Sequence, residues 1–158
     1  MANHGKFKAA VEATPSIRRA YRPGLQALPK ADRNRLDERE LATGSVFVDE
    51  TLKDAKLHPN SHRWDYGIGL GNARVGEHIL WLETHHAASG ETERVLLKLD
   101  WLKTWLRTEA PELNKLPGKF VWLLTNKENN PNDRRRRAQA AEQKLLIRVQ
   151  GTLHLSKF

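Results

Sequence analysis

WDYGIGL, residues 64–70, and HILWLETHHA, residues 78–87, are the two stretches on which the fold depends. Both are apolar runs rich in β-branched and aromatic residues, which predicts strands. The glycine-flanked segment GNARVG between them predicts a hairpin turn. Each strand carries an acid among apolar neighbours, Asp65 in the first and Glu83 in the second. Acids in the core of a sheet need an explanation, because an unpaired buried charge is costly.

The geometry of a hairpin predicts that these two acids meet. If the hairpin is symmetric about Arg74, Asp65 lies directly across from Glu83. Opposed side chains in an antiparallel pair have Cβ atoms about 4.5–5.5 Å apart. Side chains alternate along a strand, so His85 shares the face of Glu83 and Thr84 points to the other face. A slip of one residue would turn Asp65 away from this cluster.

The predicted position of two carboxylates opposite each other favours a cation bound between them. They repel each other unless one is protonated or a cation lies nearby. Mg²⁺ prefers oxygen ligands and often uses one or two carboxylates, with water and substrate phosphate completing its shell. Purely structural roles are the alternative. Asp65 could bond a turn near Ser61, and Glu83 could pair with Arg63 or Arg74.

The rest of the chain alternates between helical and extended patterns, and residues 30–42 read as a short helix or a charged connector. The patterns predict a helix over 7–21 with a break near Pro15, a strand over 45–52, a helix over 93–108, a strand over 119–125, a helix over 134–146 and a strand over 148–155. Three consecutive strands favour antiparallel pairing, and strands that alternate with helices favour parallel pairing. The sequence therefore predicts an α/β fold with a mixed central sheet flanked by helices, in the order α-β-β-β-α-β-α-β.

Length and composition limit the class of protein. A chain of 158 residues suggests one domain, residues 1–158. The chain has no cysteine, which excludes disulfides and thiolate metal sites. Its first 21 residues contain no long apolar run, so we expect no signal peptide, no membrane span and a cytoplasmic location.

The net charge of +8 predicts a polyanionic partner, DNA before RNA. Candidate contacts to nucleic acid are the basic residues Arg18, Arg19, Lys98, Arg134 and Arg135. A homodimer or a protein partner is also compatible with a chain of this size.

The element order and the two acids resemble the PD-(D/E)xK nuclease superfamily, which has the restriction-endonuclease-like fold. Asp65 matches the first acid of its motif, Glu83 the second, and His85 stands at the position of the lysine. Trp64 occupies the position where proline is usual. A lysine could instead come from the next helix, where Lys98 is the candidate. Glu12 would correspond to an additional acid that the first helix often carries in this superfamily.

The resemblance implies metal-assisted hydrolysis of phosphodiester bonds in DNA, with RNA as the less expected substrate. Asp65 and Glu83 would hold Mg²⁺ or Mn²⁺, with a backbone carbonyl near Thr84 as a further ligand. His85 would orient or deprotonate the attacking water. Two alternatives stay open: a nucleic-acid-binding accessory protein whose site has decayed, and a protein-interaction module.

Overall fold

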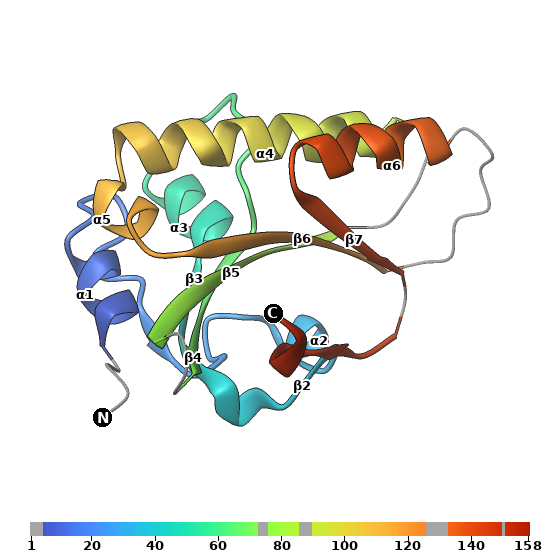
Figure 1. Cartoon of the computed structure of the whole chain (residues 1–158). Coiled ribbons are helices and arrows are strands. Elements are labelled where there is room, and N and C mark those ends of the chain that lie inside the picture. The colour runs from blue at the N-terminus through green and yellow to red at the C-terminus, as the bar shows by residue number, and fades with distance from the viewer. Residues whose placement is uncertain (1–4, 73–75, 86–89, 126–132, 150) are drawn as a thin grey trace.

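The computed structural model describes residues 5–72, 76–85, 90–125, 133–149 and 151–158. A six-stranded sheet runs through the middle of the molecule in the order β1-β3-β4-β5-β6-β7 (Figure 1). Strands β1, β3, β4 and β5 pair antiparallel, whereas β5, β6 and β7 pair parallel. The strands are β1 (Arg22–Pro23), β3 (Ala42–Phe47), β4 (Tyr66–Asn72), β5 (Gly76–His85), β6 (Gly118–Leu124) and β7 (Leu145–Val149). The predicted mixed sheet flanked by helices is confirmed.

The two faces of the sheet are covered differently (Figure 1). One face is covered by α1 (Lys6–Glu12), α3 (Val48–Asp54), the long helix α4 (Glu91–Thr108), α5 (Pro111–Asn114) and α6 (Asp133–Glu142). Short elements cover the other: α2 (Lys30–Arg33), β2 (Leu36–Asp37), η1 (Arg39–Leu41), β8 (Leu153–His154) and η2 (Leu155–Lys157). Strand β2 pairs in parallel with β8, which joins the early part of the chain to its last residues. Among the described helices, none has the length and apolar character needed to cross a membrane.

Alternation along β5 assigns each side chain to a face. Ile79 and Trp81 belong to the core beneath the helices, and Leu80 and Leu82 belong to the core on the opposite face. The period of two continues to the end of the strand, so Glu83 lies on the face covered by α4. Both faces of β5 are buried, which explains why its sequence is an almost continuous apolar run.

The glycines of β4 make room for large side chains from neighbouring elements. A Cβ atom on Gly67 would lie 2.7 Å from the indole of Trp81, and one on Gly69 would lie 2.7 Å from the ring of Phe7. Real Cβ contacts are not this close, so glycine is required at both positions by core packing.

Two predicted boundaries in the first half of the chain are wrong. The helix predicted over 7–21 ends at Glu12, and the segment 13–19 consists of turns. The strand predicted over 45–52 ends at Phe47, where α3 begins. Val48 and Leu52 are both buried, and their spacing of four fits a helix. Asp49 and Glu50 in the first turn favour that helix through its dipole.

Three further predictions need correction. Only Lys30–Arg33 of residues 30–42 is α-helical, and the rest forms β2, η1 and the start of β3. The helix predicted over 134–146 ends at Glu142, because Lys144 takes a left-handed conformation with φ of 61°. The strand predicted over 148–155 instead begins at Leu145, which pairs with Phe120, and β8 is separate.

Candidate active site

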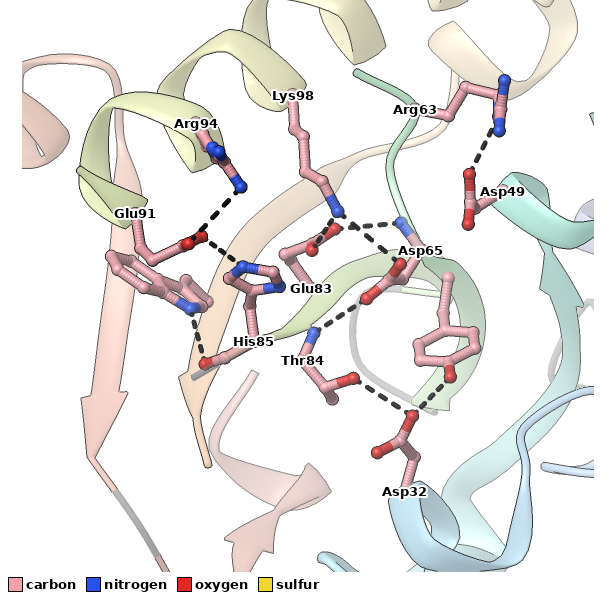
Figure 2. A network of polar contacts seen from close by, with 12 residues as sticks. Asp32, Asp49, Arg63, Asp65, Glu83, Thr84, His85, Glu91, Arg94 and Lys98 are labelled. Atoms are coloured by element: carbon pink, nitrogen blue, oxygen red, sulfur yellow. Dashed lines mark hydrogen bonds and ion pairs between the residues drawn. The ribbon is translucent and has the colours of Figure 1, made fainter. Parts of the chain in front are cut away.

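The β4–β5 hairpin places Asp65 and Glu83 opposite each other. Tyr66 pairs with Leu82, so the same register brings Asp65, one residue before β4, against Glu83. The Asp65 amide donates to Glu83 Oε1 at 3.1 Å, and the Thr84 amide donates to Asp65 Oδ2 at 3.2 Å. Each acid therefore accepts a backbone hydrogen bond from the other strand (Figure 2). The predicted register is confirmed.

Lys98 reaches both carboxylates from helix α4. Its Nζ lies 2.6 Å from Glu83 Oε2 and 3.9 Å from Asp65 Oδ1 (Figure 2). Lys98 is in the inward stripe of α4, beside the buried residues Val95, Leu99 and Leu102. Lys98 falls at the helical spacing of these buried residues, and this spacing in the sequence indicates that its side chain points into the molecule. Lys98 thus contacts both acids, as expected if the motif lysine comes from the next helix, and its predicted contact with nucleic acid stays a prediction.

Burial and mutual repulsion set the electrostatics of the cluster. The Glu83 side chain has no exposed surface, and the Asp65 side chain is 14% exposed. Burial, together with the neighbouring Asp65 charge, raises the pKa of Glu83 well above its usual range. Burial also raises the pKa of Asp65, although Lys98 partly opposes that shift. Burial alone would lower the pKa of Lys98, but Glu83 and Asp65 outweigh it and the net shift is upward.

His85 lies on the same face of β5 as Glu83 but faces a different partner. Its Nε2 forms a short contact with Glu91 Oε2, from the first turn of α4 (Figure 2). Arg94 Nη1 lies 3.6 Å from the other oxygen of Glu91, and the His85 carbonyl accepts a bond from Trp122. Glu91 therefore fixes the orientation of the imidazole. No sequence pattern singled out Glu91, because residues 88–92 resemble a loop before the helix.

Asp32 binds the opposite side of the same strands. Its Oδ2 accepts hydrogen bonds from the Thr84 hydroxyl, at 3.0 Å, and from the Tyr66 hydroxyl (Figure 2). Burial and the nearby Asp32 raise the pKa of Tyr66. Asp32 lies in α2, inside a charged segment without periodicity, so no sequence pattern distinguished it. Thr84 and Glu83 do point to opposite faces, as the alternation predicts.

Arg63 is engaged elsewhere, which excludes it as the partner of Glu83. Its Nε donates to Asp49 Oδ1 at 2.8 Å, and its Nη1 donates to the His58 carbonyl at 2.7 Å. Asp49, at the start of α3, contributes a small further increase to the pKa of Asp65.

The remaining predicted residues do not join the acid pair. Glu12 ends helix α1, whose Phe7 amide donates to Glu77 at the far end of β5. Glu77 and Glu83 are six residues apart, about 20 Å along a strand. Arg18 and Arg19 are exposed on the turns after α1. Arg134 and Arg135 belong to α6, but their side chains lie outside the described residues, as does Arg74.

The carboxylate oxygens of Asp65 and Glu83 are the kind of ligand that a hard divalent cation prefers, but the site supplies few of them. No group of three or more His, Cys, Asp or Glu side chains in the described part of the chain could hold a metal ion. Mg²⁺ is commonly bound through one or two carboxylates, with water and phosphate oxygens completing the shell. Asp65 and Glu83 meet that requirement. The Thr84 amide donates a hydrogen bond to Asp65, and an N–H group cannot ligate a metal. A metal ligand from a backbone carbonyl near Thr84 therefore stays a prediction.

Comparison with known proteins assigns no family to this chain. No family model, no curated protein and no solved structure matches it. The function is therefore inferred from the geometry of the site.

Proposed function

We propose that this chain is a metal-dependent nuclease of the PD-(D/E)xK type, with Asp65, Glu83 and Lys98 as its central residues. The observation that supports the proposal is the meeting of these three side chains, from the start of β4, from β5 and from α4, at one buried position. Two acids and a lysine match the residue types of the superfamily motif. The lysine comes from the helix instead of from position 85, where the chain has histidine.

In this proposal the residues divide the work of phosphodiester hydrolysis. A water oxygen forms a bond to phosphorus and loses a proton to solvent, and the bond from phosphorus to one sugar oxygen breaks, that oxygen taking up a proton to leave as a hydroxyl. Asp65 and Glu83 would hold Mg²⁺ or Mn²⁺, which supplies Lewis-acid polarisation of the phosphate and an acidified water when bound. The Lys98 ammonium donates hydrogen bonds toward charge that develops on the phosphate oxygens. His85, oriented by Glu91, positions the attacking water.

A second candidate is a nucleic-acid-binding protein with an inactive site. The contact between Lys98 and Glu83, at 2.6 Å, favours it, because an ammonium in this position compensates the acids without a metal. A protein-interaction module has less support. The large hydrophobic residues that the structure exposes, Leu57, Leu97 and Leu146, belong to three separate segments.

The decisive experiment is cleavage of supercoiled plasmid and of single-stranded DNA with Mg²⁺ or Mn²⁺. We expect wild type to cut and Asp65→Asn, Glu83→Gln and Lys98→Met to lose about 100-fold or more in rate, since each removes either a metal ligand or the cation that faces the phosphate. Asp100→Asn is the matched control, because Asp100 is an exposed acid on the same helix as Lys98. Each variant is first checked for cooperative thermal unfolding.

The outcomes separate the candidates. Cutting that survives in both acid variants would mean that the site is wrongly assigned. DNA binding by wild type without cutting, in either metal, would favour the inactive nucleic-acid-binding protein. Cutting that stops in all three variants and persists in Asp100→Asn supports the nuclease.

A further inference from the structure

An open groove of about 540 Å³ lies between the turns that follow α1 and the helix α3. Its lining includes Ser16, Arg18, Arg19, Arg22, Thr51 and Asp54. None of the residues assigned to the candidate active site lines it. Three guanidinium groups against one carboxylate leave the groove with a net charge of about +2. A concave surface of that charge attracts anions.

The polar groups of the groove suit phosphate oxygens. Arg22 Nη1 donates to the carbonyls of Arg19, at 3.0 Å, and Tyr21, at 2.8 Å, so its guanidinium is held in place by neutral acceptors. Arg18 and Arg19 are exposed. The Ser16 hydroxyl oxygen is buried and has no hydrogen-bond partner within the described structure. A phosphate oxygen in the groove reaches this hydroxyl only when the Ser16 side chain rotates outward, because nothing of the size of water can contact it in the present rotamer.

Helix α3 connects the groove to the acid pair. The amide of Val48, its first residue, donates to the Asp65 carbonyl at 2.8 Å. Thr51 and Asp54, in its later turns, line the groove. Seven helical residues span about 10 Å at 1.5 Å per residue. That equals the axial rise of about three base pairs of a duplex, at 3.4 Å per base pair.

We infer that this arginine groove, defined by Ser16, Arg18, Arg19 and Arg22, binds the phosphodiester backbone of the nucleic-acid substrate to one side of the cleavage position. The inference rests on the proposed function for the nature of the substrate. It adds that the bound strand also contacts the turns after α1, about one length of α3 away from Asp65. Contacts to phosphate fix position without reading base sequence, so the groove contributes affinity and not sequence specificity.

Binding without cleavage tests the groove independently of catalysis. Fluorescence anisotropy is measured with a labelled DNA duplex and with its single strand, in EDTA, over a series of NaCl concentrations. Arg18→Gln/Arg19→Gln and Arg22→Gln are compared with wild type. Arg107→Gln/Lys119→Gln is the control that removes two exposed positive charges outside the groove. We expect the slope of log affinity against log salt to fall by about 1 for each phosphate that the variant no longer neutralises, and to change little in the control.

The outcomes separate the groove from the nuclease. Reduced affinity and slope in the groove variants, with a control like wild type, support the inference even if the protein never cuts DNA. Groove variants that bind like the control would overturn it, even if wild type is an active nuclease. Absence of any DNA binding by wild type would overturn it as well.

Discussion

Lys98 shows how a single residue can combine opposite electrostatic effects. Its side chain is largely buried, which disfavours a charge, yet two carboxylates keep it protonated. The cluster of Asp65, Glu83 and Lys98 carries one net negative charge when all three groups are ionised. Each member therefore depends on the others, and removal of the one cation leaves two acids that repel.

Lys98→Met should destabilise the protein in a pH-dependent way. The pKa of Glu83 is raised in the folded state, so folded stability falls as pH rises from about 4.5 through that raised value. Without Lys98 the pKa of Glu83 rises further, and this loss extends to higher pH. We expect a cost of about 3 kcal/mol near pH 8 and much less near pH 5. Urea unfolding at both pH values measures it.

Glu83→Gln/Lys98→Met is the control for that measurement. It removes the carboxylate as well, so its cost should vary less between the two pH values than the cost of Lys98→Met, with Asp65 as the remaining acid that loses the compensating charge. A pH-independent cost of Lys98→Met alone would contradict the account of the buried pair.

Part of this site could be predicted from sequence and part could not. The opposition of Asp65 and Glu83 follows from the hairpin, because pairing within a hairpin is local and its register is set by the turn. The contact of Lys98 with Glu83 depends on how α4 lies across the sheet, which local patterns do not specify. For the same reason His85 was expected beside the acids, whereas α4 supplies Glu91 as its partner.

At the scale of elements, the β4–β5 hairpin is held by packing across its glycines. Gly67 lies under the indole of Trp81, its direct partner in the register. Gly67 faces the helices, as Asp65 does, so the indole covers the strand two residues from the acid pair. This contact ties the position of Asp65 to the packing of β5.

Gly67→Ala should therefore destabilise the hairpin. Its Cβ would lie 2.7 Å from Trp81 Cζ3, and the indole is buried and has little room to move. We expect a cost of about 1–3 kcal/mol from overpacking, measured by urea unfolding. Trp81→Phe removes the clashing atom, so the double variant should cost less than the sum of the two single variants. Additive costs would mean that the clash is relieved in another way.

The segment 45–52 shows why strand predictions fail at element ends. VFVDETL contains residues that favour strands, and the alternating pattern persists beyond Phe47. The structure instead uses the spacing of Val48 and Leu52 to bury one side of α3. Tertiary burial therefore decided between two local patterns of similar strength.

The whole molecule is a sheet between two unequal layers. Helices cover one face, and short elements that include the last residues of the chain cover the other. Leu155, in η2, is only 1% exposed and belongs to this second core, with Leu80 and Leu123. The order of helical and extended patterns predicted a mixed sheet flanked by helices, but not that residues 25–41 and 153–158 would form one of the layers. Those segments lack periodicity, and their contacts join distant parts of the chain.

Leu155→Ala tests whether this second layer is part of the cooperative fold. A buried leucine replaced by alanine should cost about 2–5 kcal/mol in the free energy of unfolding. Leu146→Ala, at a leucine that is 37% exposed, is the matched control and should cost less than about 1 kcal/mol. Equal, small effects in urea unfolding would mean that residues 153–158 unfold separately from the sheet.

The backbone hydrogen bonds that the two acids accept, Glu83 from the Asp65 amide and Asp65 from the Thr84 amide, have a consequence for how this sequence could change over evolution. Each carboxylate accepts an amide hydrogen from the opposite strand, and an amide side chain could accept it equally well. Folding alone would therefore tolerate Asp65→Asn and Glu83→Gln together with a neutral residue at position 98, because the acceptors are kept and no buried ammonium is left without a partner. A lineage released from catalysis should drift toward these amides. If related chains keep acids at both positions, and not merely side chains that accept hydrogen bonds, that pattern would indicate selection for activity.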